Sequence, residues 1–283
     1  MAILGGTGNL GFGLAVRLAK AGVPVVIGSR AADRAQEAAQ RALALVPGAD
    51  VTGDENAAAT AKAARVVFIA VPYASSASTV KSIAESLRED QIVVDVTVPI
   101  GPAVGGKPTQ LIGVWQGSAA QQTQSLVPKG VRVVSALHTI SGASLEDLDA
   151  ELNQDTLVCG DRKADKEPVI ELISKIGSGL RPVDAGRLEM SRIVEGLTPL
   201  LIGINIRYKT HSASPSPASE ASLTSEDAQT VSVPSRRPAL VRWPAACAVP
   251  KLVPARPPRS RSSVEPGGFE PPTPCLQSRC STS

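Results

Sequence analysis

Six residues near the start of the chain have the types and spacing of a phosphate-binding turn. They are Gly6, Thr7, Gly8, Asn9, Leu10 and Gly11, which form the pattern G-x-G-x-x-G. The first glycine permits a tight turn, the second lets backbone approach a pyrophosphate, and the third lets a helix pack closely on a strand. A helix that begins here also offers free N–H groups and a partial positive charge to phosphates. The pattern predicts a dinucleotide site, and the alternative is a glycine turn with only a packing role.

A second group of residues distinguishes a site for NADP from a site for NAD. A site for NAD usually has Asp or Glu at the end of the second strand, about 20 residues further on, to bind the ribose diol. This chain has Ser29 and Arg30 there, followed four residues later by Arg34. A hydroxyl and two guanidinium groups suit a 2′-phosphate, and no acid stands there to repel it. The sequence therefore predicts NADP(H), against the alternative that both arginines are merely solvated at the start of a helix.

Three further positions follow predicted strands and are weaker candidates. Tyr73 and Val98 each come after an apolar run, where loops of a parallel sheet line the ligand crevice. Both are candidates to flank the nicotinamide, or else are ordinary loop residues. His138 follows another apolar run and is a candidate contact to a substrate carbonyl or phosphate, although a lone loop histidine is more often structural. No hydrolase triad and no Tyr-x-x-x-Lys pair accompanies them, so the residues alone predict no acid–base pair and no metal site.

Alternating strands and helices are predicted to position these residues. Short β-branched apolar runs alternate with amphipathic segments of ten or more residues, which indicates right-handed βαβ units and a parallel sheet. We therefore expect an α/β protein with a Rossmann-type, doubly wound parallel sheet. The predicted strands are 2–4, 24–27, 66–71, 92–96, 131–136 and 156–159, and the predicted helices are 10–21, 32–46, 75–87, 163–176 and 189–205.

Composition limits the partners of the chain. Its 283 residues carry a formal net charge of only +3, and aromatic residues make up 2%. These values predict no nucleic-acid partner and no membrane partner. Four cysteines and two histidines leave little for a metal cluster. With no export signal and no disulfide framework, the expected compartment is the cytoplasm.

The composition changes after His211. Residues 212–283 hold 13 of the 23 prolines, 14 serines and three of the four cysteines. Prolines interrupt every short apolar run, so this segment is predicted to be a disordered Pro/Ser-rich tail. Residues 268–271 (GFEP) can be encoded by a string that resembles the T-arm of a transfer RNA gene. We therefore hypothesise that the tail is an out-of-frame translation product, which the nucleotide sequence would decide.

Several sequence blocks resemble the NADPH-dependent reductases of coenzyme F420, also called F420:NADP oxidoreductases. The glycine turn is shared by many proteins, but the later blocks in this order are much more specific. The similarity spans about residues 1–211. Its blocks are 5–11 (GGTGNLG), 28–30 (GSR), 135–140 (SALHTI), 158–161 (VCGD), 179–186 (GLRPVDAG) and 195–201 (EGLTPLL).

The resemblance implies a fold, a reaction and two carriers. It implies a Rossmann domain over 1–130 and a small C-terminal α/β domain over 131–211, with the deazaflavin F420 over the nicotinamide of NADP(H) between them. Hydride would pass directly between the carriers, so no protein residue need act as acid or base. By the same resemblance, residues 7–10 would hold the pyrophosphate and Ser29, Arg30 and Arg34 the 2′-phosphate. Val98 would lie on the nicotinamide side, and His138 with Thr139 would lie beside the deazaflavin.

One departure and three alternatives remain at this stage. Family members follow the last helix with a short apolar end that helps to close the deazaflavin site, whereas here the chain runs into 212–283. The first alternative is an NADP-dependent reductase of another small substrate, such as an imine or a β-hydroxyacid. The others are a non-catalytic NADP-binding sensor and a damaged product with no activity. A homodimer is the expected assembly if the chain associates at all.

Overall fold

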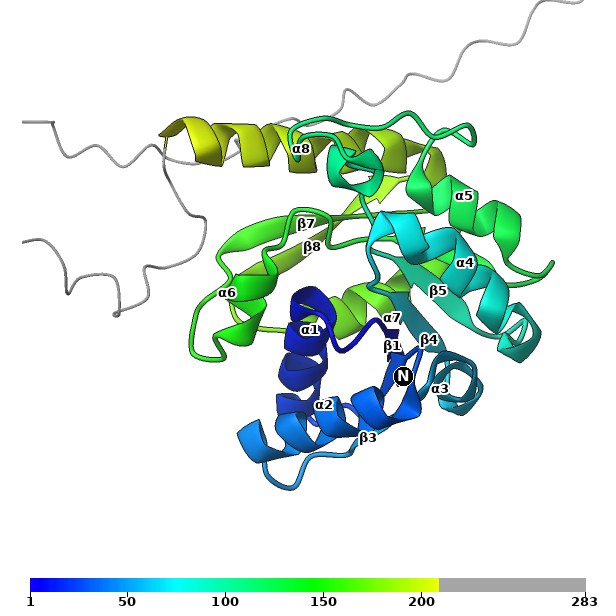
Figure 1. Cartoon of the computed structure of the whole chain (residues 1–283), viewed down its shortest axis with the longest axis vertical. Helices are drawn as coiled ribbons and strands as arrows, with labels where there is room; N and C mark the ends of the chain where they lie inside the picture. The colour runs from blue at the N-terminus through cyan, green and yellow to red at the C-terminus, as the bar shows by residue number, and fades with distance from the viewer. Residues whose placement is uncertain (209–283) are drawn as a thin grey trace, which may run out of the picture. The chain divides into compact units, whose positions relative to one another are not determined.

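A computed structural model describes residues 1–208 of the chain. The predicted tail, 212–283, and the departure after His211 lie outside the described residues. An eight-stranded sheet forms the centre of the described part, in the order β3-β2-β1-β4-β5-β6-β7-β8 (Figure 1). The strands are β1 (Ala2–Leu4), β2 (Val25–Ser29), β3 (Val51–Glu55), β4 (Val66–Ile69), β5 (Ile92–Asp95), β6 (Arg132–Ser135), β7 (Gln154–Gly160) and β8 (Leu180–Gly186).

Helices cover both faces of this sheet. One core joins α1, α2 and α7 to the sheet, and a second core on the other face joins α3, α4 and α5. This arrangement is the doubly wound α/β fold that the alternation of segments predicted. The helices are α1 (Asn9–Lys20), α2 (Ala32–Leu45), α3 (Asn56–Lys62), α4 (Tyr73–Ile83), α5 (Ala119–Leu126), α6 (Gly142–Glu146), α7 (Lys163–Ser174) and α8 (Ser191–Tyr208), with short 3₁₀ turns at Ala84–Ser86, Gly101–Val104 and Leu188–Met190.

The order of the strands creates a crevice between β1 and β4. Strands β1 to β6 are all parallel, and β1 pairs with β2 on one side and with β4 on the other. The chain therefore winds outward in opposite directions from β1 and β4. In sheets of this kind, ligands bind outside the carboxyl ends of the strands at such a switch point. Both the glycine turn after β1 and the segment after β4 lie there.

The second half of the sheet departs from the predicted parallel order. Strand β7 runs antiparallel to β6, with Val134 opposite Gly160, and β8 then runs parallel to β7. Because β6 continues the sheet of β1 to β5 without a break, one sheet spans both predicted domains. The boundary at residue 130 stays a prediction.

Five elements are absent from the sequence-based expectation: β3, β8, α3, α5 and α6. Strand β3 buries only Val51 fully, and β8 buries only Leu180, because both lie at the edges of the sheet. Within residues 1–208, no helix combines the length and the apolar character that crossing a membrane requires.

Candidate functional site

The turn between β1 and α1 depends on glycines, but the left-handed residue is Gly5 and not Gly6, to which the motif assigned the tight turn. Gly5 has φ +80°, and a Cβ there would lie 2.6 Å from the carbonyl oxygen of Ala70. A Cβ on Gly11 would lie 2.5 Å from the carbonyl oxygen of Gly5, so α1 can pack this closely on the turn only with glycine. A Cβ on Gly8, by contrast, would meet only the carbonyl oxygen of Gly5, at 3.5 Å. Gly8 therefore presents an open side to the crevice.

Helix α1 begins directly after this turn. Gly8 closes the turn by donating its N–H to the carbonyl oxygen of Gly5 at 3.0 Å, so the Gly8 N–H is already used. The first turn of α1 contains no acidic residue and receives no side-chain cap. The N–H groups of Asn9 and Leu10 have no helical acceptor, as at the start of any helix. These two groups, more than that of Gly8, are the ones available to an anion.

A cavity of about 220 Å³ opens beside the turn. None of the residues that line it is acidic, and within residues 1–208 neither Arg30 nor Arg34 forms an ion pair. The predicted residues around this cavity are Thr7, Gly8, Ser29, Arg30 and Arg34. The cavity is also lined by Asn56, Ser75 and Thr79, which no sequence motif distinguishes. The arrangement is an uncompensated cationic pocket next to a helix start, which suits a phosphorylated ribose.

The other predicted residues lie outside that lining. Gly6 is buried in the turn, Asn9 and Leu10 begin α1, and Gly11 is buried in the first turn of that helix. Tyr73 begins α4 and is partly buried, and burial raises its pKa.

Val98 and Thr139 are both partly buried in the segments that follow β5 and β6. Because β4, β5 and β6 are parallel, Tyr73, Val98 and Thr139 share one edge of the sheet with the cavity.

His138 is a buried imidazole without a partner. Its side chain is only 5% exposed, and neither ring nitrogen has a hydrogen bond within the described residues. Burial lowers the pKa of His138 to about 4, so the ring is neutral at neutral pH. Buried polar groups normally find partners, so an orphaned imidazole indicates a site that a ligand completes.

The backbone around His138 is held in place by distant residues. Leu137 has φ +66°, and among the described residues it is the one non-glycine with a positive φ. Such strained conformations persist only where the surroundings fix them, and they are common at ligand sites. Two hydroxyls supply hydrogen bonds here: Thr156 accepts from the N–H of Leu137 at 3.1 Å, and Thr198 of α8 donates to the carbonyl oxygen of His138 at 2.8 Å.

The segment after His138 reaches the start of α1. A Cβ on Gly142 would lie 3.0 Å from the backbone nitrogen of Leu10. The segment between β6 and α6 therefore connects buried His138 to the start of α1 without another element between them.

Two buried carboxyl groups lie behind this edge of the sheet. Asp95, at the end of β5, accepts hydrogen bonds from the N–H of Thr97 and the hydroxyl of Thr123. Glu195 of α8 accepts from the N–H groups of Ala119 and Ala120, at 2.9 and 3.2 Å, and so caps α5. Burial raises the pKa of Asp95, and it raises that of Glu195 to about 8. No sequence motif distinguished either residue, because their partners lie far away in the chain.

Glu195 should make stability depend on pH. Its pKa is about 8 in the folded chain against 4.5 for an ordinary glutamate, so the folded state holds the proton more tightly. Stability from this group is therefore complete at low pH and is lost as pH rises toward 8. Below pH 6.5, the depressed pKa of His138 acts in the opposite direction. Every other titrating group is shared by the unsubstituted chain and a Glu195 variant, including the Met1 amino group, whose pKa burial lowers, so the difference between the two chains from pH 6.5 to 8 isolates Glu195.

We expect Glu195→Gln to lose this pH dependence. Between pH 6.5 and 8, the unfolding free energy of the variant should rise relative to the unsubstituted chain by up to about 2 kcal/mol. Urea denaturation at each pH measures the difference. The exposed Glu189→Gln serves as control and should give a curve parallel to that of the unsubstituted chain. Parallel curves for Glu195→Gln as well would show that Glu195 does not titrate in this range.

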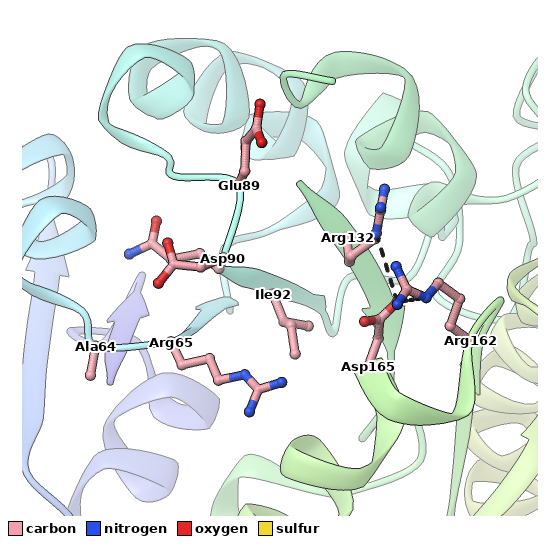
Figure 2. A pocket seen from close by; sticks show the side chains of 9 residues that line it. Ala64, Arg65, Glu89, Asp90, Ile92, Arg132, Arg162 and Asp165 are labelled. Carbon is pink, nitrogen blue, oxygen red and sulfur yellow. Dashed lines mark ion pairs between the residues drawn. The ribbon is translucent and has the colours of Figure 1, made fainter. Parts of the chain in front are cut away.

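A larger cavity, of about 390 Å³, lies on the side of the sheet where the parallel strands begin, opposite the carboxyl ends that hold the glycine turn (Figure 2). It lies by the amino ends of β4, β5 and β6, and it contains none of the predicted residues. Its arginines are largely compensated, since Asp165 lies 3.9 Å from Arg132 and 3.7 Å from Arg162. The cavity beside the glycine turn, where the predicted residues gather, is the stronger candidate.

Comparisons with known proteins point to one family. A family model described as NADP oxidoreductase, coenzyme F420-dependent, matches residues 1–99. The F420-dependent NADP reductase of Methanocaldococcus jannaschii is 46% identical, over 74% of this chain and 94% of that protein. The enzyme of the same name from Methanothermobacter marburgensis is 39% identical, over 75% of this chain and 95% of that protein.

A solved structure agrees with these matches. It belongs to a candidate F420-dependent NADP reductase from Arthrobacter sp. FB24, which is 28% identical with a TM-score of 0.62 and is covered over 94% of its length. It covers 74% of this chain. Since the chain spans nearly the whole of these relatives, it belongs to the family of F420-dependent NADP reductases.

Proposed function

We propose that the protein transfers a hydride between NADP(H) and coenzyme F420. The observation that supports this most is the cavity beside the glycine turn, where a helix start meets two guanidinium groups that form no ion pair within residues 1–208, and where no carboxylate is among the lining residues. The names and coverage of the relatives support the same pair of carriers.

The proposed NADP site uses three groups of residues. Thr7 and the N–H groups of Asn9 and Leu10 bind the pyrophosphate, and the open face of Gly8 lets it approach. Ser29, Arg30 and Arg34 bind the 2′-phosphate. A guanidinium pairs well with phosphate because its planar N–H groups match two oxygens at once.

The proposed F420 site lies at the next strand ends. When bound, the two carriers supply the hydride chemistry themselves, between nicotinamide carbon 4 and deazaflavin carbon 5. The chain orients them and keeps water away. His138 and Thr139 contact the deazaflavin, while Val98 and Tyr73 line the nicotinamide side. A neutral His138 is suited to this role, because it can donate a hydrogen bond from one nitrogen and accept one at the other.

A spectrophotometric assay tests the reaction. Oxidised F420 is mixed with the full chain and NADPH, and with NADH as the control. Loss of the deazaflavin absorption with NADPH alone is the expected result. Tight NADPH binding without turnover would favour a sensor, and reduction of an imine or β-hydroxyacid without F420 would favour another reductase.

His138→Leu separates substrate binding from folding. Because the imidazole has no hydrogen bond to lose among the described residues, the unfolding free energy should change by less than about 1 kcal/mol. The KM for F420 should rise about tenfold, which corresponds to one lost hydrogen bond. The Kd for NADPH, measured on the same preparation, should stay unchanged. An unaltered KM would place His138 outside the F420 site.

A homodimeric state also belongs to the proposal. Ile193, Leu200 and Ile204 are 54%, 58% and 41% exposed, and their spacing of seven and four residues puts them on one face of α8. Such a stripe supports self-association, which light scattering of the full chain would check. The cytoplasmic compartment and the lack of a nucleic-acid partner stay predictions from sequence.

A further inference from the structure

Asn56 is a buried amide without a hydrogen bond. It begins α3 directly after β3, and its side chain is 8% exposed. Its Oδ1 is buried with no partner, and within residues 1–208 its side chain makes no hydrogen bond. Buried polar groups of native proteins are nearly always paired, so this amide needs a reason to be there.

The backbone places Asn56 beside the residues proposed for the 2′-phosphate. In the parallel ladder of β2 and β3, Ser29 lies opposite Glu55, so Asn56 is level with Arg30. A Cβ on Gly28 would lie 3.0 Å from Asn56 Oδ1, which shows that the amide packs against the end of β2. Asn56 also lines the same cavity as Ser29, Arg30 and Arg34.

A second buried amide shows what a purely structural role looks like. Gln91 is 0% exposed, and both ends of its side chain are bonded. Its Nε2 donates to the carbonyl oxygens of Thr60 and Ala63 at 2.9 and 2.8 Å, and its Oε1 accepts from the N–H of Arg88. Gln91 stabilises the chain by these bonds, whereas Asn56 has none.

We infer that Asn56 is a specificity-determining residue that binds the phosphorylated ribose of NADP. Its amide can donate N–H groups to a phosphate and accept a bond from a ribose hydroxyl. Being neutral, it does not repel the phosphate as the acid of an NAD site would. The inference rests on one part of the proposed function, the binding of NADP. It does not depend on which molecule accepts the hydride.

Asn56→Asp tests the inference with a change of charge at constant size. Binding of NADPH and of NADH is measured separately by cofactor fluorescence, without F420. The Kd for NADPH should rise about tenfold to a hundredfold, because a carboxylate replaces a donor next to a phosphate. The Kd for NADH should stay the same or fall, because a carboxylate accepts from a free 2′-hydroxyl. An unchanged ratio of the two constants would overturn the inference.

Asn56→Leu and Gln91→Leu form a matched pair that separates binding from stability. Asn56→Leu should keep or raise the melting temperature of the cofactor-free chain and weaken NADPH binding about tenfold. Gln91→Leu should lower the melting temperature and leave the Kd for NADPH unchanged. If Asn56→Leu lowered the melting temperature and bound NADPH normally, Asn56 would be structural.

The experiments distinguish an error in the proposed reaction from an error in the role of Asn56. A chain that transfers no hydride to F420 but loses NADPH preference in Asn56→Asp would contradict the reaction and support the role of Asn56. A chain that reduces F420 with an unchanged preference in that variant would do the reverse.

Discussion

Arg30→Asp is expected to raise the Kd for NADPH at least about a hundredfold and to leave the Kd for NADH within about threefold. The substitution removes charge-assisted hydrogen bonds to the 2′-phosphate, worth about 1.5–3 kcal/mol, and puts a negative charge in their place. NADH has no 2′-phosphate and loses little. Titration of cofactor fluorescence at low ionic strength measures both constants.

Arg41→Asp is the matched control for this charge reversal. Arg41 lies on α2, like Arg34, but its guanidinium stacks over the ring of Phe12, 4.4 Å from the centroid, and does not line the cavity. It should change the NADPH constant only slightly, through long-range charge that salt screens. Equal weakening by Arg41→Asp and Arg30→Asp would mean that net charge alone, and no specific contact, favours NADPH.

The parts of the fold that were predictable are those that local sequence specifies. Strand β4 is buried along its whole length and appears in the sequence as a continuous apolar run. Strand β3 gives no such signal, since Gly53, Asp54 and Glu55 make up most of it. Its position depends on a contact instead, because a Cβ on Gly53 would lie 2.1 Å from the carbonyl oxygen of Ala35 in α2.

The direction of β7 shows a second limit. An apolar run in the sequence predicts a strand, but it does not say which strand pairs with it or in which direction. The antiparallel pairing of Val134 with Gly160 depends on the path of the chain between β6 and β7. Strand β8 is harder still, because Pro182 removes a donor and normally argues against a strand. Proline is tolerated there because β8 is the edge strand.

The candidate site divides along the same line. Gly8, Ser29 and Arg30 could be identified from the sequence, because a short motif and the absence of an acidic residue indicate their chemistry. Glu195 and Asn56 could not be identified in this way, because the importance of each depends on its surroundings in the folded chain. Glu195 meets Ala119 across 76 residues of sequence, and Asn56 is informative only because its side-chain amide has no hydrogen-bond partner within residues 1–208.

Loss of Arg17 should strongly reduce stability. It lies on α1 and is 4% exposed. Its guanidinium donates to carbonyl oxygens of the segment around α6 and of the end of α7, and burial lowers its pKa. The acceptors are Leu145 at 2.8 Å, Ser144 and Ala150 at 3.0 Å, Ile176 at 3.3 Å, and Asp147. One side chain thus holds three segments together behind the phosphate turn.

Arg17→Met should lower the unfolding free energy by about 3 kcal/mol, because it removes the donor of several partly buried carbonyl groups while keeping the apolar stem. Urea denaturation measures the loss. Arg41→Met, at an exposed position on α2, should cost less than about 1 kcal/mol. Since Arg17 lies two turns from the phosphate turn, NADPH should still bind to the folded variant. Equal losses for Arg17→Met and Arg41→Met would mean that the carbonyl groups find other donors and that α1 is held by its apolar face alone.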